Sequence, residues 1–400
     1  MMIARVIELD NLSEAGKEML AIGCDKVGVE IMSHKAISRV IKIKNVRPPA
    51  ANIIKQEMLS FGGEAATAHG AIDQSVDTTD LLIFGTLRQI SLLLNKLKIH
   101  QFGLSQIGAE INIALGNYQV RPGPIARMDF GERTYIMGIL NVTPDSFSDG
   151  DKFMDVATAL AHAKKMVMDG ADIIDVGGES TRPGSKTVSA AEEKKRVLPV
   201  IEKLAKETKT LISIDTTKAE VAQAALAAGA RMVNDISGLR FDKNMAKVVA
   251  EARVPVCLMH MQGNPRNMQN NPVYSDLMDE MLNYLQEGLE IAKEAGILHG
   301  QIIVDPGIGF GKTVVHNLEI LRRLRELKIL GCPILVGASR KSVIGQVLNL
   351  PVSDRGEGTS ATIAISIANG ANIIRVHDVA EMARVAKMAD SIVRRRNEND

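Results

Sequence analysis

Two segments of this 400-residue chain concentrate short oxygen-bearing side chains around glycine and proline. In MGILNVTPDSFSDG (137–150), Asn141 follows an apolar run, and the second segment is DVGGESTRPGS (175–185). In the second, two glycines allow a ligand close to the backbone, while Thr181 and Arg182 offer a hydroxyl and a guanidinium suited to phosphate oxygens. The first segment alone could be a turn whose polar side chains bond to the local backbone. Together they indicate a site for an anionic ligand.

Other apolar runs also end in polar residues. Asp215, Asn234 and Asp305 each end such a run. Arg375 and His377 lie two apart on the last run, so they share one face of a strand. Helix capping is the alternative role for Asp215, because DTTKAE is a good capping sequence. His377 alone could be a structural residue at a strand end.

The segment from Gly307 to Thr313 (GIGFGKT) has the composition of a phosphate-binding loop but lacks its spacing. A Walker loop needs four residues between its first glycine and Gly-Lys, and the residue that would have to be that glycine is Pro306. We therefore predict a tight turn between a strand and a helix.

The composition excludes several classes of function. Lys plus Arg number 48 against 47 Asp plus Glu, so no overall field would draw the molecule to nucleic acid or to an acidic membrane. Aromatic residues make up only 3%, which argues against the stacking platforms of single-strand binders. The three cysteines form no CxxC pair, and no signal peptide or membrane span is recognisable. We expect a cytoplasmic protein with no nucleic-acid or membrane partner.

Eight short apolar runs alternate with helical stretches from about residue 134 onward, which predicts parallel strands buried on both faces. The runs are 134–140, 171–176, 211–215, 230–235, 254–260, 301–305, 333–338 and 372–377, and the clearest helices are 156–170, 189–208, 218–229 and 379–396. We favour a (β/α)8 TIM barrel over an open doubly wound sheet. In a barrel all the polar strand ends converge on one face, whereas an open sheet would bring only a few together.

Residues 1–125 differ from this pattern and predict a small α/β domain of unknown role, preceding a catalytic barrel over 126–400. Candidate strands are 3–9, 39–44 and 80–85, and candidate helices are 51–63 and 87–98. The segment 116–124 carries two prolines and two glycines, which predicts a linker.

Eight ordered motifs across residues 134–380 resemble dihydropteroate synthase, a pterin-binding TIM-barrel family. They are MGILNVTPDSFSDG, IIDVGGESTRPG, SIDTTK, VNDISG, CLMHMQGNP, DPGIGFGK, GASRKS and RVHDV. The resemblance implies a transferase of folate biosynthesis that joins 4-aminobenzoate to (7,8-dihydropterin-6-yl)methyl diphosphate. It also implies a homodimer and a target of sulfonamides.

The resemblance also implies roles for individual residues. The pterin would be bound by Asp175, Asp215, Asn234, Asp305 and Lys341, with Met259 lining its cavity; the diphosphate by Arg375 and His377; Mg²⁺ by Asn141; and 4-aminobenzoate by Ser339, Phe310 and Pro183. We predict Asn141, Thr181, Arg182 and Lys341 as the catalytic residues.

The chemistry requires no strong general base, because the amine of 4-aminobenzoate is neutral at pH 7. We predict a loose, SN1-like substitution, in which the dihydropterin stabilises a cationic methylene as pyrophosphate departs. One alternative is a pterin-binding methyltransferase, which has no diphosphate to expel. The other is a non-catalytic pterin-binding or regulatory protein.

Overall fold

The chain divides into two compact units, Met1–Gln119 and Val120–Asp400. The computed structural model describes residues 2–99, 103–143, 156–180 and 187–394. No helix in these ranges has both the length and the apolarity that crossing a lipid bilayer requires.

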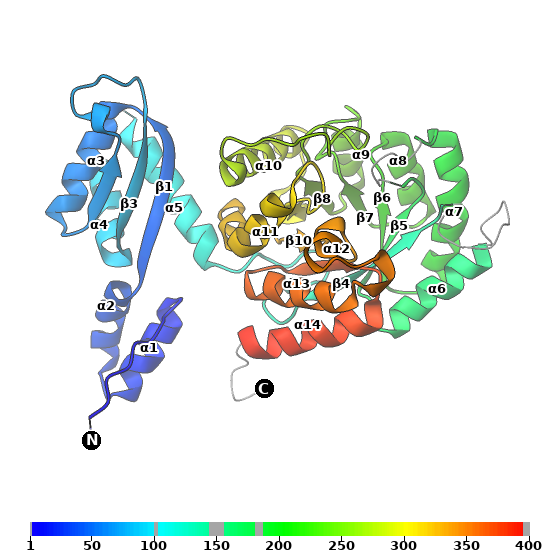
Figure 1. The fold of residues 1–400 in the computed structure, drawn as a ribbon, viewed down its shortest axis with the longest axis horizontal. Coiled ribbons are helices and arrows are strands. Elements are labelled where there is room, and N and C mark those ends of the chain that lie inside the picture. The colour runs from blue at the N-terminus through cyan, green and yellow to red at the C-terminus, as the bar shows by residue number, and fades with distance from the viewer. Residues whose placement is uncertain (1, 100–102, 144–155, 181–186, 395–400) are drawn as a thin grey trace. The chain divides into compact units, whose positions relative to one another are not determined.

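Eight parallel strands form the core of the second unit (Figure 1). They are β4 (Tyr135–Asn141), β5 (Ile173–Gly177), β6 (Leu211–Asp215), β7 (Met232–Asp235), β8 (Val256–Met259), β9 (Ile302–Asp305), β10 (Leu335–Val336) and β11 (Ile373–Val376). The first and last strands of the sheet meet where Val304 bridges Ile334 in parallel register and its amide donates to the Pro333 carbonyl at 2.9 Å. The sheet therefore closes, which confirms the (β/α)8 barrel and excludes the open sheet.

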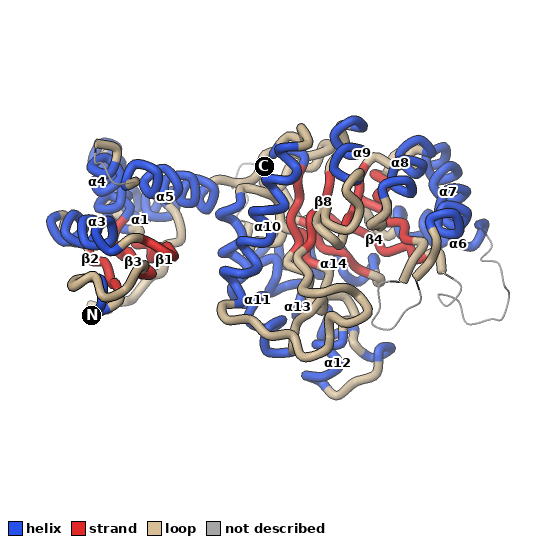
Figure 2. Tube along the Cα trace, turned by 90° about the horizontal axis from the view of Figure 1, so that it is seen from above, coloured by secondary structure: helices blue, strands red, loops and turns tan. Residues whose placement is uncertain are grey.

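Helices surround the barrel strands, as Figure 2 shows in blue around red. They are α6 (Val156–Met168), α7 (Ala190–Glu207), α8 (Ala219–Ala228), α9 (Met245–Ala252), α10 (Leu277–Glu294), α11 (Val314–Arg323), α12 (Ser342–Leu348), α13 (Gly356–Ala368) and α14 (Val379–Val393). Gly170, Gly229 and Gly370 follow α6, α8 and α13 with φ of +107°, +123° and +100°. Glycine suits these helix ends because few other residues adopt that conformation without strain.

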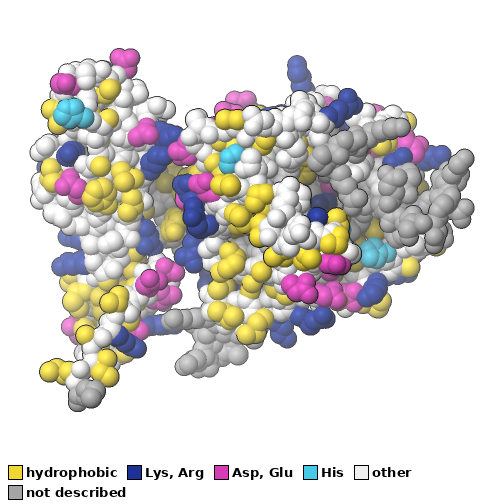
Figure 3. Space-filling view, viewed as in Figure 1, with side chains coloured by type: hydrophobic (Ala, Val, Ile, Leu, Met, Phe, Trp, Pro, Cys, Tyr) yellow, Lys and Arg dark blue, Asp and Glu magenta, His cyan; other side chains and the backbone are white. Residues whose placement is uncertain are grey.

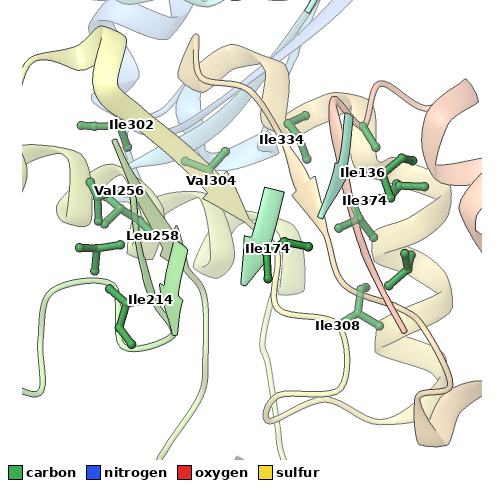
Figure 4. Packing of buried hydrophobic residues seen from close by; sticks show 14 of the residues in the cluster. Ile136, Ile174, Ile214, Val256, Leu258, Ile302, Val304, Ile308, Ile334 and Ile374 are labelled. Atoms are coloured by element: carbon green, nitrogen blue, oxygen red, sulfur yellow. The ribbon is translucent and has the colours of Figure 1, made fainter. Parts of the chain in front are cut away.

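Along each strand, residues that face the surrounding helices alternate with residues that face the barrel interior. The outward set includes Ile136, Ile174, Ile214 and Ile374, which pack against the helices (Figure 4). Burial of each such side chain stabilises the fold by roughly 1.5–3 kcal/mol. Since alternation has a period of two, the residues one position further along each strand point inward.

The barrel interior is apolar at one end and polar at the other. Met137, Ile173, Met232, Ile303 and Ile373 belong to one buried cluster that fills the end where the strands begin. Three residues that precede β4 join this cluster: Ile125, Met128 and Phe130. The apolar core therefore leaves only the carboxyl-terminal strand ends for a ligand.

The first unit is a three-stranded antiparallel sheet with helices. Its elements are α1 (Leu12–Ala21), α2 (Lys26–Ala36), β1 (Ser38–Val46), α3 (Pro48–Ser60), β2 (Glu64–Thr67), β3 (Thr79–Thr86), α4 (Leu87–Leu97) and α5 (Leu104–Gln119), with strand order β1-β3-β2. Hydrophobic side chains gather near α1 and α2 in Figure 3. Exposed apolar residues on these two helices include Leu20 on α1 and Val27 and Ile31 on α2.

Two predictions for this unit are wrong, and one strand was missed. Residues 3–9 form no strand, because their apolar residues do not alternate and Val6 is fully exposed. The expected linker starts too early, since residues 116–119 are the last turn of α5. Strand β2 was not predicted, because its four residues are too short to show a pattern. The small α/β class itself is confirmed.

Candidate active site

A cavity of about 820 Å³ opens at the carboxyl-terminal ends of the barrel strands. Its lining includes side chains from β4, β6 and β11 and from the segments after β5, β9 and β10. The predicted site residues that line it are Asn141, Asp215, Phe310, Ser339, Lys341, Arg375 and His377. Barrel closure thus brings together residues that are up to 236 positions apart, as from Asn141 to His377.

Arg375 links two carboxylates inside the barrel. Its Nε donates to Asp175 Oδ2 at 2.6 Å, and its Nη2 donates to Asp215 Oδ2 at 2.7 Å. Asn234 Nδ2 also donates to Asp175 Oδ2, at 2.9 Å, whereas Asp175 Oδ1 is buried without a hydrogen-bond partner among the described residues. Burial raises the pKa of Asp215 to about 7, against the opposing effect of Arg375. This cluster combines acceptors with a cation at the cavity wall.

Asp305 and Lys341 supply a second pair of opposite charges. Asp305 Oδ1 accepts a hydrogen bond from the Gly307 amide at 2.7 Å, and burial raises the pKa of its carboxyl to about 6. Burial and the nearby Arg375 lower the pKa of Lys341 to about 8. The Lys341 ammonium lies 4.1 Å from the centre of the Phe310 ring, within range of a cation–π contact.

Ser339 and His377 contact each other at the ends of β10 and β11. Ser339 Oγ lies 3.1 Å from His377 Nδ1, and the His377 amide donates to the same hydroxyl at 3.3 Å. Burial, followed by the charge of Arg375, lowers the pKa of His377 to about 4. His377 is therefore a neutral imidazole at pH 7.

The backbone between Ser339 and Lys341 has a left-handed conformation that three contacts stabilise. Arg340 has φ of +55°, which is uncommon for a residue with a side chain. Its guanidinium donates to both carboxylate oxygens of Asp378, its amide donates to Thr359 Oγ1, and its carbonyl accepts from Arg355. This conformation places Ser339 and Lys341 on the cavity wall together.

The remaining predicted residues are placed as follows. Asp175, Asn234, Met259 and Asp305 are buried, with no more than 6% of each exposed. Met259 packs in a cluster with Phe310, so it adjoins the cavity wall. Thr181, Arg182 and Pro183 lie outside the described residues.

Sequence reasoning missed four charged residues near the site. Lys218 pairs with Glu179, which lines the cavity, and with the buried Glu193. Lys312 also lines the cavity although only 3% of it is exposed. The segment GIGFGKT contains Lys312, but nothing in its pattern distinguishes a buried lysine from an exposed one. No local pattern pairs Lys218 with its distant partners.

Comparison with known proteins assigns the family. A family model described as pterin binding enzyme matches residues 137–377. The dihydropteroate synthase of Synechocystis is 52% identical over 283 residues, covering 70% of this chain and 98% of that protein. The chain belongs to the dihydropteroate synthases. A Clostridium difficile dihydropteroate synthase, crystallised in the presence of pteroic acid, is 52% identical with a TM-score of 0.64, covering 67% of this chain and all of that one.

One relative also matches beyond the barrel. A Halobacterium salinarum protein, named a probable bifunctional folylpolyglutamate synthase/dihydropteroate synthase, is 41% identical over 384 residues, covering 96% of this chain and 46% of that protein. Because Val120–Asp400 has only 281 residues, the match must include most of Met1–Gln119. That protein therefore carries a segment similar to the first unit of this chain.

Proposed function

We propose that the barrel condenses 4-aminobenzoate with (7,8-dihydropterin-6-yl)methyl diphosphate, giving 7,8-dihydropteroate and pyrophosphate. The observation that carries the proposal is the single cavity that gathers Asp215, Phe310, Lys341 and Arg375. Acceptors, an aromatic surface and two cations are what a pterin, an aromatic acid and a diphosphate would need. Family membership supports the same reaction.

The buried acceptors suit a pterin ring. A pterin presents an edge of N–H donors and ring acceptors, and each unmatched group would cost about 1–3 kcal/mol when buried. Asp175, Asp215 and Asp305 offer carboxylate acceptors, Asn234 offers both an acceptor and donors, and Lys341 offers only donors. Because Asp175 Oδ1 has no partner among the described residues, a ligand N–H or a water has a place to bind there. Met259 would pack on the ring.

Arg375 and His377 are the described groups best placed for the diphosphate. The guanidinium of Arg375 bonds the two carboxylates through Nε and Nη2, so its Nη1 donors remain for the diphosphate. His377 would act as a neutral hydrogen-bond donor rather than as a cation. Thr181 and Arg182 would complete this set.

Asn141 would hold Mg²⁺. The described residues contain no group of three or more His, Cys, Asp or Glu that could form an all-protein metal cage. A single amide ligand still fits Mg²⁺, because this ion keeps several waters and binds substrate phosphates. When bound, the ion would neutralise charge on the departing pyrophosphate.

The other end of the cavity suits 4-aminobenzoate. Ser339 Oγ and the backbone before α12 would receive its carboxylate, and Phe310 would pack against its ring. Pro183 would close over it. Its neutral amine can attack without a base.

The substitution proceeds by departure of the leaving group before full attack. The bond between the pterin methylene and the diphosphate oxygen breaks, and its electron pair leaves with pyrophosphate. The dihydropterin stabilises the cationic methylene, the amine lone pair forms the C–N bond, and the extra proton on nitrogen passes to water. Arg375 and Lys341 would favour the transition state because negative charge grows on the leaving group. A kinetic isotope effect at the methylene typical of a tight, associative transition state would contradict this mechanism.

Complementation of a folate-requiring strain tests the function. We expect growth with the full chain and with Val120–Asp400 alone, and no growth with Lys341→Ala. Failure of both wild-type forms to support growth, despite soluble expression, would contradict the proposal. Methyl transfer from a tetrahydrofolate without pyrophosphate release would instead favour the methyltransferase.

A homodimer of the barrel is the assembly we propose. Exposed apolar residues lie on three helical segments that contact one another, α11, α12 and α13, and on the turn between the last two. They are Val315, Leu318, Val347, Leu348, Val352 and Ile365. Exposed apolar residues on elements that contact one another favour association. Sedimentation of wild type as a dimer and of Leu318→Glu as a monomer would support the assembly, whereas a monomeric wild type would contradict it.

The cytoplasmic location stays a prediction.

A further inference from the structure

Lys312 carries a buried amino group, and its hydrogen bonds among the described residues are to three backbone carbonyls and to His260. Only 3% of the residue is exposed. Its Nζ lies 3.0 Å from the Gly307 carbonyl, 2.9 Å from the Phe310 carbonyl and 3.3 Å from the His260 carbonyl. A fourth contact, at 2.8 Å, is with His260 Nδ1. Burial lowers the pKa of Lys312 to about 7; while its amino group is protonated it can only donate, so Nδ1 is then the unprotonated nitrogen of that imidazole.

The surroundings of His260 agree with this assignment. Burial, followed by the charges of Lys312 and Arg240, lowers the pKa of His260 well below its usual value. The ring packs edge-on against Tyr284, with centroids 4.9 Å apart. His260 is thus a fixed, neutral acceptor at the end of β8, and Lys312 ties it to the segment that follows β9.

That segment, residues 307–311, approaches the chain after β8 too closely for any side chain at two of its positions. Gly307 and Gly311 both have positive φ, and a Cβ at Gly307 would collide with the His260 carbonyl. A Cβ at Gly311 would lie 2.5 Å from the Gln262 carbonyl. The segment carries Phe310, so its position fixes the ring on which Lys341 lies.

Two further side chains hold the middle of the same segment. Asn317 Oδ1 accepts from the Gly309 amide at 2.7 Å, and Gln269 Nε2 donates to the Gly309 carbonyl at 2.5 Å. Asn317 and Gln269 bond only Gly309 in this segment, whereas Lys312 bonds the carbonyl of Gly307 and that of Phe310 itself. Removing its ammonium would leave three buried carbonyls without that donor.

We propose that Lys312, acting with His260, is a positioning residue that holds Phe310 against the ring of 4-aminobenzoate. The inference rests on the proposed function, because it assigns that ring to the face of Phe310. Lys312 acts through Phe310 and touches no reacting atom in this role.

A double-mutant cycle tests the proposal in the full-length protein. In Lys312→Met we expect KM for 4-aminobenzoate to rise about five- to tenfold, as loss of a well-placed aromatic contact would produce, while KM for the pterin diphosphate changes less than about twofold. In a Phe310→Leu background the same substitution should change KM for 4-aminobenzoate by less than about twofold, because the ring through which it acts is gone. Lys247→Met, at a side chain that is 75% exposed, is the matched control.

Equal rises in both KM values, or the same rise with and without Phe310, would overturn the proposal. If Lys312→Met does not fold, Lys312→Gln decides the same cycle, since its amide keeps two donors and should restore part of the affinity.

A measurement that does not depend on turnover separates this inference from the proposed function. The protein is labelled with 4-fluorophenylalanine, and the ¹⁹F spectra of wild type and Phe310→Leu are compared. The signal that is missing from the spectrum of Phe310→Leu belongs to residue 310. We expect Lys312→Met to shift or broaden that signal and to leave the others in place. An unchanged Phe310 signal would overturn the positioning role, whereas a wild-type protein that makes no dihydropteroate would contradict only the proposed function.

Discussion

Replacement of Arg375 by methionine should destabilise the barrel in a pH-dependent manner. The guanidinium bonds Asp175 and Asp215, whose side chains are 0% and 11% exposed. Methionine fills much of the same space but leaves two carboxylates inside the barrel without their cation. The expected loss of stability follows from the burial of these charges, because an ion pair on the surface would contribute little to the free energy of unfolding.

Loss of one partner of a buried ion pair typically costs about 3–5 kcal/mol. We expect the free energy of unfolding of Arg375→Met to fall by about that amount at pH 8, a large part of the roughly 5–15 kcal/mol that stabilises a domain. Burial already raises the pKa of Asp215 to about 7 with Arg375 present, and removing that cation raises the pKa further. A carboxyl whose pKa is higher in the folded than in the unfolded protein contributes stability only while it is protonated in the folded state. That contribution is complete below the unfolded pKa of about 3.9 and is lost as pH rises through the folded-state pKa. The deficit should therefore be smaller at pH 5 than at pH 8.

Urea denaturation followed by tyrosine fluorescence measures this loss. Three of the four tyrosines, Tyr135, Tyr274 and Tyr284, belong to Val120–Asp400, so the signal reports chiefly on the barrel. Arg384→Met, at a side chain that is 72% exposed, is the control. Adding Asp175→Asn to Arg375→Met should recover part of the stability, because it removes one buried charge. A loss below about 1 kcal/mol, or a loss equal at both pH values, would refute the electrostatic reasoning.

Three further predictions concern catalysis and its dependence on each unit. Lys341→Ala should lower kcat about 10²–10³-fold. Wild-type kcat/KM should fall as pH rises through about 8, because the lowered pKa of Lys341 lets its ammonium lose the proton there. Lys341→Arg should move that fall to higher pH, and an unchanged pH profile would contradict the role of Lys341. Sulfonamides should compete with 4-aminobenzoate in steady-state inhibition, and insensitivity to both compounds would be hard to reconcile with the site. Removal of residues 1–119 should leave kcat within about twofold, and a loss above tenfold would show that the first unit contributes to the reaction.

The barrel could be predicted from the sequence because its signals are local and repeated. All eight strand predictions overlap observed strands, since runs such as 302–304 are apolar on both faces and are followed directly by a polar residue. The first unit gave weaker signals. Its strand β2 has four residues, and the apolar residues of 3–9 have no period, so local pattern could not decide whether they pair with a neighbour.

Contacts within the site depend on distances that no local pattern contains. Arg375 was assigned to a diphosphate, yet it also bonds Asp175, 200 positions earlier, and Asp215. The sequence placed these residues at strand ends, but only closure of the barrel fixes which carboxylate faces which cation. Lys312 illustrates the same limit, because its burial follows from the close approach of two loops at Gly307 and Gly311.

Product formation by the purified full-length protein is the most direct test of the central claim. Incubation with Mg²⁺, 4-aminobenzoate and (7,8-dihydropterin-6-yl)methyl diphosphate should give 7,8-dihydropteroate by mass spectrometry and one pyrophosphate for each dihydropteroate formed. Absence of the product, or pyrophosphate release that does not depend on 4-aminobenzoate, would contradict it.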